Sequence, residues 1–94
     1  MKAPNPFKVV RCYYEKREWF ITYDGREVAR IATDIEDTPR GKWVQGYWVT
    51  IEADGTDCYI DTDGGSTETR LAFRNAKEFA FEHLAKLLAE GVEL

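Results

Sequence analysis

The amino-acid sequence predicts an α+β fold, with an antiparallel meander sheet of five to six strands and one C-terminal amphipathic helix packed on one face. Three observations carry this prediction. Segments rich in β-branched and aromatic residues recur from residue 7 to residue 62, and tight-turn signals such as Asp24-Gly25 and Asp54-Gly55 separate them. The last segment has apolar residues at helical spacing. Short connections favour antiparallel pairing of sequential strands.

Length and composition favour a single folded domain over residues 1–94. The chain has 94 residues, of which 44% are hydrophobic and 14% aromatic. Aromatic content of this kind is not typical of a disordered chain, and domains of this length are common. Residues 1–6 contain two prolines and no periodicity, so we expect a flexible start.

The predicted strands follow one another with one long interruption. The first strand starts at Phe7 and ends before a charged turn at Lys16–Glu18. Further strands are expected at residues 19–24, 27–33, 43–52 and 56–62. Residues 34–42 contain Pro39 and Gly41, which break the alternation, so this segment is predicted to be a loop.

The C-terminal helix is predicted to begin at Asn75, because Asn75 and Glu78 have the spacing of a capping box. Residues 69–73 then form either a short sixth strand or the approach to the helix. Gly91 is expected to end the helix as a C′ glycine. The apolar stripe that should face the sheet consists of Ala76, Phe79, Ala80, Leu84, Leu87 and Leu88.

The fourth predicted strand has large aromatic residues on both of its faces. Alternation puts Trp43 and Tyr47 on one side with Val49 and Ile51, and Trp48 on the other side with polar neighbours. We therefore expect Trp43 and Tyr47 in the core and Trp48 on the opposite face, with a bulge or bend at Gly46. Strong curling of the sheet, a second subunit, or a binding surface would each account for Trp48.

The fifth predicted strand suggests a function for the exposed Trp48. If Cys58 and Ile60 face the helix, Tyr59 lies beside Trp48 with Asp57 and Asp61 at its flanks. An aromatic patch edged by carboxylates suits a basic protein surface. The residues predicted to bind a partner are Trp48, Tyr59, Asp57 and Asp61. The predicted function is that of a small acidic, non-catalytic module that binds another protein or itself, as a homodimer, through the outer sheet face and the acidic turns.

Nucleic-acid binding is the alternative function. Its candidate residues are Arg26, Arg30, Arg70 and Arg74, which could contact phosphates while exposed aromatic rings stack on bases. The charge distribution is unfavourable to it. The net charge is −4, and residues 51–94 carry ten Asp/Glu against four Lys/Arg. Binding to a phosphate backbone depends on cationic side chains.

The sequence has no motif for catalysis, a cofactor, a metal ion or a membrane span. His83 is the single histidine, and its apolar neighbours predict a half-buried, hydrogen-bonded side chain. Asp61-Thr62-Asp63-Gly64 lacks the spacing of a calcium loop, and Asp54 and Asp63 are interpreted as turn formers. Cys12 and Cys58 are expected to be buried free thiols. A cytoplasmic location is expected, since no signal peptide is evident.

Overall fold

The computed structural model describes residues 6–12, 17–62 and 66–94, with side chains from residue 69 onward in the last range. The described elements are five strands and one helix: β1 (Phe7–Arg11), β2 (Glu18–Tyr23), β3 (Arg26–Thr38), β4 (Gly41–Ile51), β5 (Thr56–Asp61) and α1 (Ser66–Ala89). The predicted flexible start lies outside the described residues except for Pro6, and the predicted turn at Lys16–Glu18 lies partly outside them.

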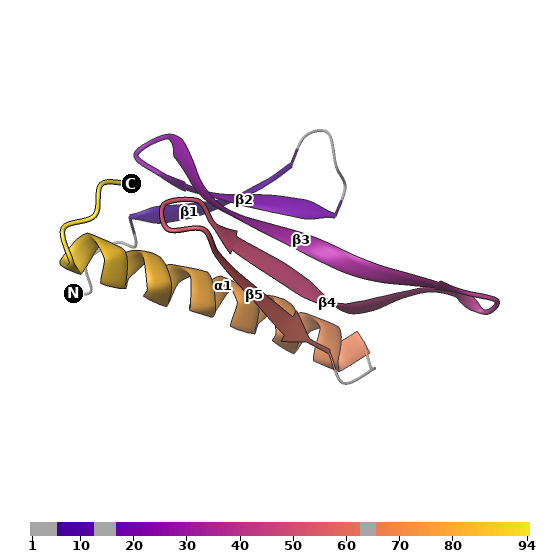
Figure 1. Ribbon diagram of the computed structural model, residues 1–94. Coiled ribbons are helices and arrows are strands. Elements are labelled where there is room, and N and C mark those ends of the chain that lie inside the picture. Colours follow the sequence, from indigo (N-terminus) through magenta and orange to yellow (C-terminus); the bar gives the residue numbers. More distant parts are fainter. Residues whose placement is uncertain (1–5, 13–16, 63–65) are drawn as a thin grey trace.

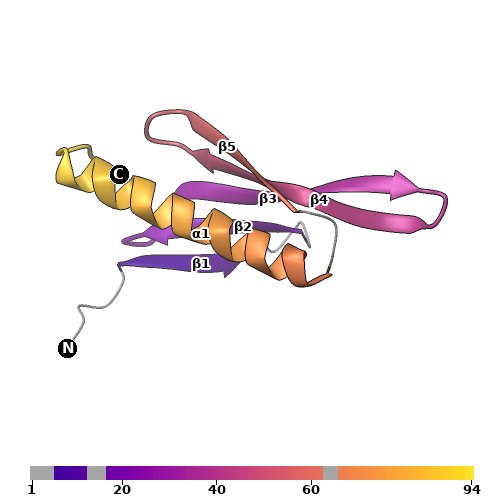
Figure 2. The same ribbon diagram turned by 90° about the horizontal axis from the view of Figure 1, so that it is seen from below.

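The sheet is an antiparallel meander with the order β1-β2-β3-β4-β5, and α1 covers one face of it (Figure 1). The predicted fold class is therefore confirmed, with five described strands. β1 and β5 form the two edges of the sheet, and α1 runs across the sheet between them (Figure 2). We call the face that packs on α1 the inner face and the opposite one the outer face.

The core lies between the inner face and α1. Ile21, Ile31, Val49 and Ile51 are fully buried on the sheet side. They meet a helix stripe of three alanines followed by two leucines, namely Ala72, Ala76, Ala80, Leu84 and Leu87. The alanines let the helix approach the β-branched side chains closely, and burial of this apolar surface is the main stabilising term.

The helix begins at Ser66, so the prediction of a start at Asn75 is wrong; of the two alternatives for residues 69–73, the sixth strand is excluded, because these residues belong to the helix. Ala72 and Phe73 continue the apolar stripe N-terminally, which makes an earlier start favourable. Asn75 is exposed in mid-helix, and Glu78 instead accepts a bond from Arg74 Nε at 3.1 Å. Within the described residues, no helix combines the length and apolar character needed to cross a membrane.

The C-terminal end of the helix is as predicted. Gly91 has a φ of 84°, its N–H donates to the carbonyl of Leu88 at 3.0 Å, and the N–H of Val92 donates to that of Leu87 at 2.9 Å. This pair of bonds is the Schellman motif, in which a left-handed residue lets the chain satisfy the last free carbonyls.

Residues 34–42 do not form the predicted loop. β3 continues to Thr38 and β4 begins at Gly41, which leaves Pro39 and Arg40 as the turn. Pro39 is tolerated because it lies in the turn and not within the ladder. The Thr38 hydroxyl closes the hairpin: it donates to Gly41 O at 2.8 Å and accepts from the Trp43 indole Nε1 at 3.0 Å.

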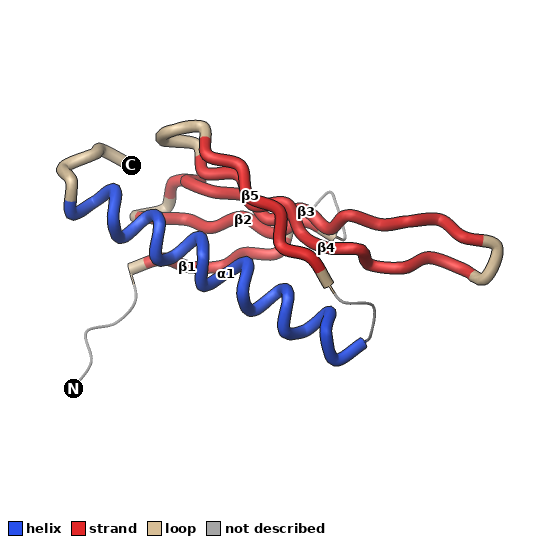
Figure 3. The backbone as a smooth tube through the Cα atoms, turned by 60° about the horizontal axis from the view of Figure 1, so that its bottom comes forward, coloured by secondary structure: helices blue, strands red, loops and turns tan. Residues whose placement is uncertain are grey.

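The β3–β4 hairpin therefore extends beyond the rest of the sheet. Strand pairing with β2 stops at Ala32, and pairing with β5 stops at Gly46. Residues 35–44 form a two-stranded ribbon that projects from one end of the molecule (Figure 3). We call this segment the arm.

Candidate binding surface

Trp48 and Tyr47 lie on opposite faces of β4, as the alternation predicts. Tyr47 is 5% exposed and packs against Trp19 and Phe73 in the core, whereas Trp48 is 48% exposed. The register sets Trp48 beside Ala32 of β3 and Tyr59 of β5 on the outer face. This placement of the two residues is confirmed.

The prediction that Trp43 lies in the core is wrong. Trp43 is 50% exposed and belongs to the arm. The register shifts where Asp34 pairs with Gly46 and Ile35 pairs with Val44, so that Gln45 is an extra residue in β4. A bulge of this kind changes which side chains face inward beyond it. Val44 packs against the core in place of Trp43. The bulge expected at Gly46 thus lies at the adjacent Gln45.

Gly46 creates the space in which Tyr59 lies. A Cβ at Gly46 would be 2.7 Å from the Tyr59 ring and 2.5 Å from the carbonyl oxygen of Ile60. Because that space is open, the Tyr59 ring crosses over β4, and its hydroxyl donates to Asp34 Oδ2 of β3 at 2.7 Å. A ring that covers a strand glycine in this way also stabilises the sheet locally. The sequence gives no sign of the Asp34 contact.

Trp48 and Tyr59 form an aromatic pair, with ring centroids 4.7 Å apart and an interplanar angle of 55°. Tilted pairs at this distance are favourable. Asp57 and Asp61 flank Tyr59 on the outer face, and Asp57 Oδ1 accepts a bond from the Thr50 hydroxyl at 2.9 Å. The residues predicted to bind a partner are thus adjacent. Together with Asp34 they form what we call the outer patch: Asp34, Trp48, Asp57, Tyr59 and Asp61.

The Tyr59 phenol is held in its protonated form. Burial of the ring, followed by the hydrogen bond to Asp34 and the charges of Asp34 and Asp61, raises the pKa of Tyr59 to about 12. Each cause disfavours a phenolate among carboxylates. The hydroxyl therefore remains a donor to Asp34 at neutral pH, and the patch presents carboxylate oxygens and aromatic faces to solvent.

The four arginines of the alternative function do not form one surface. Arg30 lies on the outer face, with its guanidinium 5.1 Å from the Phe20 ring centroid and 3.4 Å from Glu27 Oε1. Arg26 is at the start of β3, and Arg70 and Arg74 are on α1, which packs on the inner face. Arg74 is paired with Glu78. The structure thus separates the cations that a nucleic-acid site would need together.

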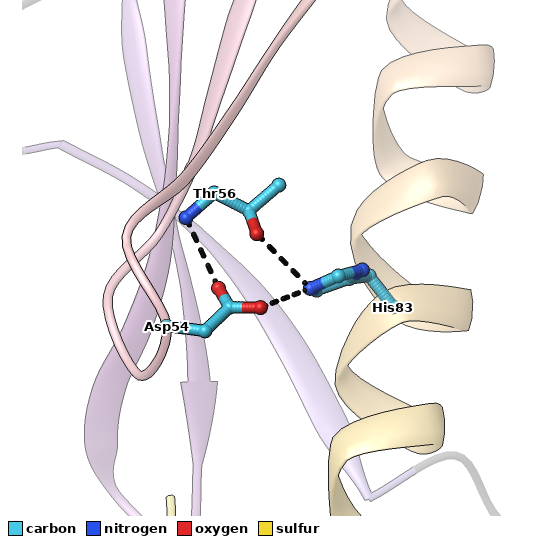
Figure 4. A network of polar contacts seen from close by, with 3 residues as sticks. All are labelled: Asp54, Thr56 and His83. Carbon is cyan, nitrogen blue, oxygen red and sulfur yellow. Dashed lines mark hydrogen bonds and ion pairs between the residues drawn. The ribbon is translucent and has the colours of Figure 1, made fainter.

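His83 joins α1 to the β4–β5 turn (Figure 4). Its Nε2 is 2.7 Å from Asp54 Oδ2 and 3.4 Å from Thr56 Oγ1, while Asp54 Oδ1 accepts the Thr56 backbone N–H at 3.0 Å. The ring also stacks on Phe79 at 5.8 Å. The expected half-buried, hydrogen-bonded histidine is confirmed, and Asp54, interpreted only as a turn former, is its partner.

This cluster ties α1 to the β4–β5 turn, and its geometry differs from that of a catalytic relay. In a relay the carboxylate and the hydroxyl bind different nitrogens of the imidazole. Here Asp54 and Thr56 both face Nε2. The hydrogen bond from His83, followed by that from Thr56, lowers the pKa of Asp54 to about 2. The ionised carboxylate therefore accepts both bonds at neutral pH and holds the turn against the helix.

The two cysteines are free thiols, as expected, but they differ in burial. Cys12 is buried, whereas Cys58 is half-buried and packs against the core from β5. Full burial of Cys58 is prevented because β5 is the last strand of the sheet. Among the described side chains, those of residues 6–12, 17–62 and 69–94, no three of His, Cys, Asp or Glu gather in a way that could hold a metal ion.

Comparisons of the chain with protein-family models, with curated proteins and with solved structures find no match.

Proposed function

We propose that the protein is a non-catalytic binding module that contacts another protein, or a second copy of itself, through the outer patch. The observation that carries the proposal is the Trp48–Tyr59 pair on the sheet face opposite α1, with Trp48 half in solvent. Tryptophan and tyrosine are enriched at protein interfaces, where they supply a large contact area with few rotatable bonds.

The charges around this pair favour a basic partner. Asp34, Asp57 and Asp61 border the two rings. On the same face, Arg30 lies against Phe20 and Glu27. A cationic side chain of a partner can contact the face of an indole ring and a carboxylate at the same time. A phosphate backbone would be repelled by the same carboxylates.

A titration with two simple probes tests the proposal. We expect a labelled oligoarginine peptide to bind the wild-type protein and a single-stranded oligothymidylate not to bind. Trp48→Ala should abolish peptide binding. Trp43→Ala is the matched control, because its ring is equally exposed at 50% but lies on the arm. Sedimentation over a dilution series, run in parallel, measures self-association of each variant.

The outcomes separate the two functions. Loss of binding or self-association in Trp48→Ala alone, with melting temperatures near that of the wild type, supports the outer patch. Equal effects of the two substitutions would contradict it. Binding of the oligothymidylate, weakened by added salt and by Arg30→Ala, would favour the nucleic-acid alternative instead.

A further inference from the structure

β5 is an edge strand, and three residues of the outer patch, Asp57, Tyr59 and Asp61, lie on it. β5 pairs with β4 on one side, and none of the described strands lies on its other side (Figure 2). Edge strands present unpaired backbone N–H and C=O groups, which can pair with a strand from another chain. A partner that binds the outer patch therefore has an open sheet edge directly beside it.

The hydrogen-bond register shows which residues of β5 face this edge. The N–H of Thr62 donates to Gln45 O at 2.9 Å, so Thr62 belongs to the set of residues that bond to β4. In an antiparallel ladder this set recurs at every second position. Residues 58 and 60 therefore bond to β4, whereas Asp57, Tyr59 and Asp61 direct their backbone groups outward.

The same three residues place their side chains on the outer face. A strand added antiparallel to β5 would set its own alternate side chains opposite Asp57, Tyr59 and Asp61, about 4.5–5.5 Å away between Cβ atoms. Its intervening side chains would extend the inner face beside Cys58 and Ile60, which are half-buried and apolar.

We infer that the partner contributes an extended segment that adds to β5 as a sixth, antiparallel strand, with cationic residues opposite Asp57 and Asp61 and an aromatic residue opposite Tyr59. This inference rests on the proposed function and specifies its partner. The expected pattern is cation–apolar–aromatic–apolar–cation. Main-chain bonds would give affinity and the alternate side chains would give specificity, as in other cases of strand addition.

Charge selects β5 over the other edge of the sheet. β1 carries Lys8 and Arg11, which disfavour a cationic strand. β5 carries Asp57 and Asp61 and no cation. A cationic segment is therefore expected to favour β5 over β1.

The test uses the peptide Arg-Val-Tyr-Val-Arg, capped at both ends, and two N-methylated forms of it. In the inferred register the tyrosine N–H points toward β5 and the valine N–H groups point away from it. We expect the parent peptide to bind. Methylation of the tyrosine nitrogen should abolish binding, and methylation of a valine nitrogen should leave the affinity nearly unchanged.

Two further measurements locate the peptide. Binding should slow hydrogen exchange at the amides of Asp57, Tyr59 and Asp61, which face the edge in the free protein. The double variant Asp57→Lys, Asp61→Lys should weaken binding by about tenfold or more. The control is Asp37→Lys, because Asp37 is an exposed carboxylate on the arm, away from β5.

Each contrary result has a distinct meaning. Equal affinity of the two methylated peptides would overturn strand addition. So would failure of the parent peptide to bind at millimolar concentration, or protection of β1 amides instead of those of β5. The proposed function survives these results if oligoarginine binding still depends on Trp48, and it fails independently if that dependence is absent.

Discussion

At the scale of single residues, a glycine organises the outer patch. Gly46 has no side chain, so Tyr59 can cross β4 and reach Asp34. The placement of the Tyr59 ring, and with it the hydrogen bond to Asp34, depends on this one position. Its requirement is steric, because its φ is not in the left-handed region that favours glycine.

Gly46→Ala tests that requirement. A methyl group there would be 2.5 Å from Ile60 O, a backbone atom that moves only with its strand. We expect a loss of about 1–3 kcal/mol in the free energy of unfolding, measured in denaturant. Thr50→Ala on the same strand, which removes only an exposed hydrogen bond, should cost less than about 1 kcal/mol. A smaller loss for Gly46→Ala than for Thr50→Ala would contradict this role.

The Asp54–His83 tie predicts a particular dependence of stability on pH. The pKa of Asp54 is about 2 in the folded protein against an ordinary value of 3.8. A carboxyl group with a lowered folded-state pKa stabilises the fold above its unfolded-state pKa, and this contribution is lost as the pH falls through the folded value.

Asp54→Asn removes the carboxyl group that titrates, so comparison with the wild type should reveal its contribution to the pH dependence of stability. We expect the difference in melting temperature between wild type and Asp54→Asn to be largest above pH 3.8 and to shrink as the pH falls toward about 2. Asp37→Asn, an exposed carboxylate on the arm, provides the control. A difference that stays constant over this range would show that the carboxyl group does not tie the turn to the helix.

At the scale of elements, α1 buries the inner face of the sheet and completes the core. Its buried stripe begins at Ala72 and ends at Leu87, and a Schellman motif at Gly91 ends the helix. The helix starts before Asn75 because the apolar stripe outweighs a local capping signal: tertiary packing provides more stabilisation than a cap.

Two alanine substitutions, one on each side of α1, check the orientation of the helix. Leu84 is fully buried, so Leu84→Ala should cost about 2–5 kcal/mol by leaving a cavity between α1 and the sheet. Glu82→Ala, on the exposed side, should cost less than about 0.5 kcal/mol. Denaturant melts of both variants measure the difference. Similar costs would mean that a different side of α1 faces the sheet.

At the scale of the whole molecule, the structure combines a central sheet covered by α1 with a two-stranded arm that extends beyond it. β2, β3 and β4 meet around Ile31 and Val49, both fully buried under α1, whereas the arm has only its own two strands. A two-stranded ribbon is marginally stable by itself. The arm is therefore held largely by its hairpin bonds around Thr38 and by Val44.

Hydrogen exchange should follow this difference. We expect amides at residues 35–44 to exchange faster than those of Ile31 and Val49, whose opening requires the core to unfold. A time course followed by NMR measures both sets in one sample. Equally slow exchange in the arm would mean that another part of the molecule, or a second copy, protects it.

Much of this architecture could be predicted from the sequence. Alternation of side chains placed Tyr47 inside and Trp48 outside, the turn pairs separated the strands, and Gly91 ended the helix. These features depend on local properties: the period of two in a strand, the left-handed conformation open to glycine, and the short reach of a hairpin.

Tertiary structure alone decided three other features. Trp43 left the core because an extra residue at Gln45 reversed the alternation, which depends on how β3 and β4 pair. The helix started at Ser66 because the inner face offered a partner to Ala72. Asp34 and Tyr59, and Asp54 and His83, met across 25 and 29 positions of the chain. A contact between residues so far apart depends on the packing of whole elements, which no local pattern encodes.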